Sequence, residues 1–380
     1  MNALLTLLLV VLSFGSGHAV GQEPGTPACE SCKDRGVVGC RVCASKPCNS
    51  ERGFTFCSVA QECGECGGVR WLDCPACARP ADAELERKRA ELAAWRAGKR
   101  EVEDVVAKRD LVFIDSQRFR LVSDLKKLEI KGAGNAHALA HLYLDRLERL
   151  HAEFVADSGV PEDKFTGPTT LMLWTSEKDQ ERASSKYTLE KATPLAKLMG
   201  KNPVVSICFG KGQLKDDEGL HRAVVHQVAH CLLSNAYDGV WLGNLKSGWI
   251  DEGVAHVYEQ RYFGSVEIWC ATTDKLVADA KLGRFEAHVL QALGQNSVVG
   301  LTTLSGQDTV ALSPLQRVFG WSYCDFLLRH RKGSLGPLAR ILKQSKPLSE
   351  AVQSALQIGL VDLELEWSTW VKANYSAKRK

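Results

Sequence analysis

The spacing of apolar positions predicts strands and helices in alternation from residue 111 onward. The runs TTLMLW and PVVSICFG are apolar, rich in β-branched residues and bounded by Gly, Pro or Ser, which is typical of buried strands. The segment LVFIDSQRFRLVSD contains a strand-like alternation. The segment before Gly159 carries apolar residues mostly three or four positions apart, which predicts an amphipathic helix ending at that glycine; they are Leu139, Leu142, Leu144, Leu147, Leu150 and Phe154. Helical spacing dominates afterwards, so residues 111–377 are predicted to form an α+β domain with a helical C-terminal half.

The preceding residues, 81–110, predict a single connecting helix. Their apolar positions recur at helical steps and lie among many charged residues. These apolar positions are Leu85, Leu92, Trp95, Val102 and Val106. Lys88, Lys99 and Arg109 interrupt the apolar seam, so a long coiled coil is not expected, and the segment is interpreted as a helical linker that packs on the domain after it.

The first residues of the chain have the pattern of a secretory signal. The apolar run at residues 3–14 is too short to span a bilayer but suits the apolar region of a signal peptide. Gly17 and Ala19 place small residues before a cleavage point after Ala19, which predicts a signal peptide at 1–19. The leader has no Lys or Arg ahead of its apolar run, so a retained membrane anchor stays the alternative. We expect an exported protein: periplasmic, extracellular or at the cell surface.

Composition and charge narrow the classes of partner. The chain has 380 residues, of which 45% are hydrophobic and 24% charged, with a net charge of +3. Its longest basic block is the closing Lys378-Arg379-Lys380, so a nucleic-acid partner is not expected. No other stretch reaches the length of a membrane span. We therefore expect no membrane contact beyond the signal segment.

Cysteines are concentrated in residues 28–80, where a spacing is repeated. Ten of the 14 cysteines lie at positions 29–77, and the pattern C-x2-C-x7-C-x2-C begins at Cys29 and again at Cys63. A segment so poor in aliphatic residues cannot form a core alone and must be held together by its cysteines. The cysteines of the two copies, predicted as metal ligands, are Cys29, Cys32, Cys40, Cys43, Cys63, Cys66, Cys74 and Cys77.

Two chemistries could hold this segment together. Paired C-x2-C units supply the four thiolates of a tetrahedral zinc site, whereas an oxidising compartment favours disulfides. The repeated spacing favours zinc, and disulfides remain the alternative. The repeat resembles the cysteine-rich zinc module of DnaJ-type proteins, although its glycines depart from the full C-x-x-C-x-G-x-G pattern. Cys48 and Cys57 lie outside the repeat and are candidates for a disulfide.

A second candidate metal site lies in the stretch HRAVVHQVAHCLL. His226 and His230 are four residues apart in a predicted helix that starts within KDDEGL, so both rings can share one metal ion. The later segment WIDEGVA carries Glu252 in the W-[LI]-x-E-G-x-A context from which gluzincin peptidases take a third zinc ligand. Residues from about 117 to 370 resemble the gluzincin domain of thermolysin- and aminopeptidase-like enzymes. The resemblance implies zinc ligation by His226, His230 and Glu252.

The residue that follows the first histidine departs from the gluzincin pattern. That family has a glutamate there as general base, and this chain has Gln227. An amide cannot cycle between charged and neutral forms, and loss of a general base typically lowers rates by about 10²- to 10⁴-fold. The family's oxyanion-stabilising tyrosine is also missing, because Tyr323 lies about one helical turn late. Arg317 could replace it, but the simpler interpretation is an exposed arginine.

Other residues near the two motifs were considered as substitutes for the missing base. His256 follows Glu252 by four residues and is a candidate outer-sphere partner, fourth ligand or base, although a space-filling role is the simpler interpretation. Asp251 is expected to face away from the metal, and Glu259 to neutralise a neighbouring cation. The cysteines outside the repeat region follow no metal-binding spacing: Cys208, Cys231, Cys270 and Cys324.

Three functions fit the sequence. The preferred one is a zinc-binding peptidase homologue, catalytically impaired by Gln227, that binds or scaffolds peptides or proteins. A working metallopeptidase with an unconventional base such as His256 is the alternative. In a third hypothesis, the cysteine-rich segment recruits a protein partner and the large domain is inert support.

Overall fold

The computed structural model describes residues 29–44, 54–58, 63–77, 83–126, 128, 130, 133–189, 191, 194–210, 212–270 and 285–376. The predicted signal peptide at 1–19 lies outside the described residues, as does Cys48. Within the described residues, no helix combines the length and apolarity needed to cross a membrane.

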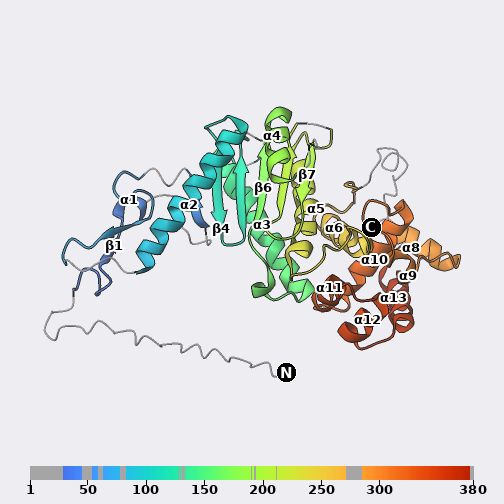
Figure 1. Ribbon diagram of the computed structural model, residues 1–380. Coiled ribbons are helices and arrows are strands. Elements are labelled where there is room, and N and C mark those ends of the chain that lie inside the picture. The colour runs from blue at the N-terminus through green and yellow to red at the C-terminus, as the bar shows by residue number, and fades with distance from the viewer. Residues whose placement is uncertain are drawn as a thin grey trace, which may run out of the picture.

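A six-stranded mixed sheet forms the centre of the molecule (Figure 1). The strand order is β2-β4-β5-β6-β8-β7, in which β5, β6 and β8 run parallel and the other neighbours pair antiparallel. Its strands are β2 (Phe54–Cys57), β4 (Val112–Ser116), β5 (Phe119–Ser123), β6 (Thr169–Trp174), β7 (Leu195–Leu198) and β8 (Val204–Cys208). The runs TTLMLW and PVVSICFG supply β6 and β8, which confirms the two predicted buried strands. Strands covered on both faces read as nearly continuous apolar runs, as these do.

Helices cover both faces of the sheet. On one face lie α2 (Ala83–Val106) and α4 (Glu177–Tyr187), and on the other α3 (Ala136–Ser158) and α5 (Asp217–Asn235) (Figure 1). The predicted linker helix is therefore α2, and its Trp95 packs edge-on against Phe113 of β4, with ring centroids 6.1 Å apart. The predicted end of α3 is confirmed: Gly159 caps this helix in the left-handed conformation, at φ 74°.

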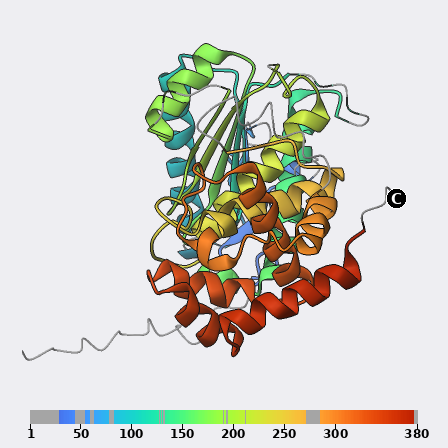
Figure 2. The ribbon, with the colours of Figure 1, turned by 90° about the vertical axis from the view of Figure 1, so that its right-hand side faces the viewer.

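The C-terminal half is helical, as predicted, and the fold is mixed α+β. The helix α6 (Gly248–Phe263) packs against α5 and against α10 (Pro314–Arg329). Figure 2 shows the other helices of the C-terminal half gathered around α6 and α10. They are α8 (Phe285–Gly294), α9 (Leu301–Ser305), α11 (Leu335–Lys343), α12 (Leu348–Leu356) and α13 (Leu360–Asn374). The α5–α6 contact positions the histidine and glutamate motifs.

The cysteine-rich segment is joined to the main sheet. Its two repeats contribute a small antiparallel pair, β1 (Val37–Gly39) and β3 (Trp71–Asp73), beside the short helix α1 (Arg41–Ala44). The strand β2 lies between the two repeats in the sequence but does not join this small pair. It hydrogen-bonds antiparallel to β4 at the edge of the large sheet. The segment 28–80 therefore contributes an edge strand to the sheet of the region that follows it.

Candidate metal centres

The helix α5 carries both histidines of the HQVAH motif in a buried position. Asp216 caps it by accepting a hydrogen bond from the backbone N–H of Gly219 at 2.9 Å, and Asp217 and Glu218 place negative charge in its first turn. The helix is buried almost all round, because the sheet lies on one side and α6 on the other. A helix in this position must place its histidines in the interior.

Three of the predicted ligands converge between α5 and α6. Nε2 of His226 and Nε2 of His230 are 3.2 Å apart. Oε2 of Glu252, on α6, is 3.3 Å from Nε2 of His230 and 4.0 Å from Nε2 of His226. All three side chains are fully buried, and Oε2 of Glu252 has no hydrogen-bond partner among the described residues.

A fourth donor, which the sequence analysis left without a role, completes the group. Sγ of Cys270 lies 3.6 Å from Nε2 of His226 and 3.5 Å from Nε2 of His230. The backbone N–H of Cys270 also donates to Oε1 of Glu252 at 3.0 Å, which anchors the loop to α6. No spacing rule connects Cys270 to the two motifs, so only the fold identifies it.

The spacing of these four atoms fits one metal ion. Nitrogen, oxygen and sulfur ligands lie about 2.0–2.3 Å from a tetrahedral zinc-sized ion, which places neighbouring ligand atoms about 3.3–3.8 Å apart. The distances given above run from 3.2 to 4.0 Å. His226, His230, Glu252 and Cys270 therefore form a group that could hold a metal ion.

Carboxylates lie behind both histidines and orient their rings. Oε2 of Glu259 is 2.9 Å from Nδ1 of His226, and Oδ1 of Asp251 is 2.9 Å from Nδ1 of His230. Such contacts turn the other ring nitrogen, Nε2, toward a metal and raise its basicity. Asp251 was expected to face away, and this expectation is wrong. The Asp251 carboxylate contacts His230, and Oγ1 of Thr309 donates a 2.7 Å hydrogen bond that holds this carboxylate in place.

Arg317 is buried in this centre, contrary to the expectation of an exposed side chain. Its guanidinium contacts the Glu252 carboxylate and donates to the carbonyls of Thr309, at 2.8 Å, and Cys270, at 2.6 Å. Burial opposes ionisation of Glu252, but Arg317 holds the pKa of that carboxyl well below its usual range. The guanidinium therefore binds the predicted ligand Glu252 and the backbone of the loop that carries Cys270.

The other residues considered for catalysis take structural positions. Nε2 of His256 lies 3.3 Å from Oε1 of Glu252, the oxygen turned away from the histidine pair, and 3.1 Å from the carbonyl of Ile268. His256 is therefore an outer-sphere neighbour of the ligand carboxylate. Tyr323 is buried, with its ring 4.3 Å from that of Trp367. Gln227, beside His226 on α5, is 5% exposed.

Electrostatics favour the thiolate form of Cys270. Burial and the nearby Glu252 oppose ionisation, yet the cations of Lys197 and His230 and a contact with His226 lower the pKa of Cys270 to about 5. Lys197 places Nζ 3.1 Å from the sulfur. Burial lowers the pKa of His226 to about 4, so its imidazole is neutral near pH 7. A thiolate and a neutral imidazole are the forms that bind metals, so a metal ion here would displace the proton that Asp251 and Cys270 favour on His230, whose pKa they raise against the effect of burial.

The repeated cysteines also assemble into groups that could hold metal ions, and the grouping crosses the two copies. Cys29 lies 3.8 Å from Cys74, and Cys32 lies 3.6 Å from Cys77, measured between sulfurs. The outer pairs of the two copies thus form one four-thiol group. These spacings match the roughly 3.8 Å expected between thiolates around a tetrahedral metal, whereas a disulfide needs about 2.05 Å.

The inner pairs meet in the same way. Sγ of Cys40 lies 3.7 Å from Sγ of Cys63, and Cys66 completes a buried group of three. Cys43, the remaining predicted ligand, is placed by its backbone in α1, and its side chain lies outside the described part of the chain. Each of the two groups joins residues from both repeats, which ties the segment together.

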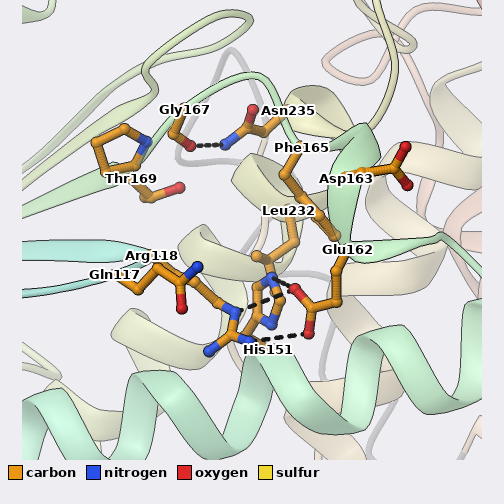
Figure 3. A pocket seen from close by; sticks show the side chains of 11 residues that line it. Gln117, Arg118, His151, Glu162, Asp163, Phe165, Gly167, Thr169, Leu232 and Asn235 are labelled. Atoms are coloured by element: carbon orange, nitrogen blue, oxygen red, sulfur yellow. Dashed lines mark hydrogen bonds and ion pairs between the residues drawn. The ribbon is translucent and has the colours of Figure 1, made fainter. Parts of the chain in front are cut away.

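A polar cavity of about 330 Å³ lies elsewhere, where β5 and β6 begin (Figure 3). Arg118 and Glu162 form a two-bonded ion pair across it, at 3.1 and 3.0 Å, above the buried ring of His151. Asn235, at the end of α5, donates to the carbonyl of Gly167 at 2.6 Å on its other side. None of the ligands described above lines this cavity.

Comparison of the chain with protein-family models and with curated proteins gives no match. The likeness to gluzincins and to DnaJ-type modules consequently rests on the motifs and on the metal-compatible groups alone.

Proposed function

We propose that this protein is an exported, zinc-binding homologue of gluzincin peptidases that binds or scaffolds peptides or proteins without hydrolysing them. In this proposal His226, His230, Glu252 and Cys270 hold a structural zinc ion between α5 and α6. The observation that carries the proposal is the position of Cys270, whose sulfur lies about equally far from both histidine nitrogens.

A catalytic zinc site keeps one coordination position for water or substrate, whereas a structural site has four protein ligands. Two imidazoles, one carboxylate and one thiolate make four. Arg317 donates to the carbonyl of Cys270, and Glu252 accepts from its N–H, so the loop is fixed on both sides of the thiol. The centre therefore has the ligand set of a closed site.

The acid–base chemistry is consistent with this interpretation. Gln227 cannot take a proton from a zinc-bound water, and His256 contacts the outer oxygen of Glu252. Arg317 is bonded to Glu252 and to backbone carbonyls and so is not available to stabilise an oxyanion. A zinc peptidase requires an open coordination position, a general base and an oxyanion donor, and in this proposal Cys270, Gln227 and Arg317 supply none of the three.

Zinc is the metal that fits this mixed ligand set. Imidazole and thiolate suit zinc, and the thiolate disfavours calcium and magnesium. The two cysteine groups of the repeats have the ligands of structural zinc sites as well. In the proposal they stabilise a segment that has little apolar core of its own.

The test compares four full-length proteins: wild type, Gln227→Glu, Cys270→Ala and the double variant. Zinc content is measured by elemental analysis, and hydrolysis with a fluorogenic peptide library. Equilibrium binding of the uncleaved peptides is measured by fluorescence anisotropy. We expect zinc in all four proteins and no hydrolysis by wild type or by Gln227→Glu, because Cys270 still fills the water position. The double variant restores both the base and the open position, and is expected to show the highest activity of the four.

Hydrolysis by wild type that disappears on removal of zinc and in His226→Ala would overturn the pseudo-enzyme proposal. Activity in Gln227→Glu alone would show that Cys270 does not close the site. A silent, zinc-loaded wild type that binds no member of the library would refute the peptide-binding part.

A further inference from the structure

A third kind of metal-compatible group lies at the junction between the cysteine-rich segment and the large domain. Cys57 ends β2, and His137 and His141 lie on consecutive turns of α3. Sγ of Cys57 is 3.2 Å from Nε2 of His137 and 3.9 Å from Nε2 of His141, and the two nitrogens are 2.9 Å apart. Neither histidine belongs to a recognisable motif.

The backbone explains why these three atoms meet. Asn135 caps α3 by accepting a hydrogen bond from Ala138 N at 2.8 Å, so the helix is regular from its first turn. Histidines four residues apart then lie on one helix face. That face is directed at the edge strand β2, whose Cys57 is 1% exposed.

The three side-chain atoms are close enough together to share one cation. The rings stand nearly perpendicular, at 86°, with their Nε2 atoms converging. Nitrogen and sulfur ligands of a tetrahedral zinc ion lie about 3.3–3.6 Å apart, and the three distances here, from 2.9 to 3.9 Å, lie on both sides of that range.

We propose that Cys57, His137 and His141 bind a zinc ion that fastens β2 to α3. One thiolate and two imidazoles are a zinc-type ligand set. The pairing of β2 with β4 is short and contains a register irregularity between Phe54 and Phe56. A metal ion at its end would fix the cysteine-rich segment to the large domain. This site shares no residue with the centre between α5 and α6 and does not depend on the proposed function.

The test counts zinc ions per full-length chain by elemental analysis after purification without added metal. The double variant His137→Ala/His141→Ala is expected to contain one zinc ion fewer than wild type. His141→Cys, which replaces one good ligand with another, is expected to keep the wild-type count. His288→Ala, in α8 and outside the metal-compatible groups of the described residues, is the matched histidine control and is also expected to keep it.

Independence from the other centre is measured in the same assay. His226→Ala/His230→Ala should remove one zinc ion, and the combination of all four changes should remove two. An unchanged zinc count in a natively folded His137→Ala/His141→Ala protein, judged by circular dichroism, overturns the proposal. Peptide mapping of the unreduced wild type that finds Cys57 in a disulfide with Cys48 overturns it as well. If the alanine variant does not fold, the proposal is tested with two other proteins: Cys57→Ser, whose zinc content is measured, and His141→Cys loaded with cobalt, whose absorbance is measured. The former should lose one ion, and the latter should gain thiolate-to-cobalt absorbance over wild type.

Discussion

Asp251 lies behind His230, with its carboxylate 2.9 Å from the ring nitrogen Nδ1. The same residue is the immediate neighbour of Glu252, which faces the front of the same histidine. One turn of α6 thus supplies both a proposed ligand, Glu252, and the group that orients another proposed ligand, His230 on α5.

Replacing Asp251 with asparagine is predicted to lower zinc affinity at this centre by about 10- to 100-fold. The amide cannot provide the negative charge that makes the imidazole of His230 a stronger donor. The effect is measured by competition with a chromogenic chelator. In Asp251→Asn, one zinc ion should pass to the chelator at a lower chelator concentration than in wild type. Asp238→Asn, at an exposed carboxylate, is the control. Equal release curves for Asp251→Asn and wild type would show that Asp251 does not support a metal ligand.

Gly253→Ala is predicted to destabilise the protein by about 1–3 kcal/mol. A Cβ at this position would lie 2.5 Å from the carbonyl oxygen of Gly320 and 2.7 Å from Sγ of Cys324, where α6 and α10 pack closely. In Gly98→Ala, at a half-buried position of α2, the added Cβ meets its nearest atom only at 3.7 Å. This control should be neutral or stabilise the helix by up to about 1 kcal/mol. Urea denaturation of the two variants gives the comparison, and equal effects would contradict the close approach.

Lys343 of α11 caps the end of α5 from another part of the fold. Its buried ammonium donates to the backbone carbonyls of Ser234, Ala236 and Tyr237 at 2.6, 2.6 and 2.8 Å. Lys343→Met leaves these carbonyls unpaired and is predicted to lower the free energy of unfolding by about 2–3 kcal/mol. The matched control is Lys346→Met, which removes only a surface ion pair with Glu350 and should change stability by less than about 1 kcal/mol. A similar loss in both variants would argue against the cap.

His151, which lies beside the Arg118–Glu162 ion pair in Figure 3, is predicted to make stability depend on pH. Burial, opposed by Glu162 and assisted by Arg118, lowers its pKa to about 4, from 6.5 for an ordinary histidine. Between these values the unfolded chain binds more protons than the folded one, so stability falls as pH decreases from 6.5 to 4.

His151→Asn removes this titration. Across that range wild type should lose up to about 3 kcal/mol more stability than the variant, which urea midpoints at several pH values measure. His330→Asn, at an exposed histidine, should retain the wild-type dependence. Parallel pH profiles for wild type and His151→Asn would contradict the assignment.

Local pattern was enough to predict several features of the protein. The buried strands β6 and β8, the end of α3 at Gly159 and the helical C-terminal half all follow from the apolar spacing. The pairing of His226 with His230 follows from helix geometry, because residues four apart share a face whatever surrounds them. These features depend on interactions within a few residues.

Contacts across the fold decided the rest. Cys270, Arg317 and Asp251 join the centre between α5 and α6 because loops and helices far apart in sequence pack there. The repeated cysteines, similar in both copies, sort into groups that cross the copies. His137 and His141 gain a thiol neighbour only because β2 pairs with β4. Sequence spacing fixes which side chains share a helix face or a turn, but the partner across a packed interface depends on how whole elements are arranged to bury their apolar surfaces.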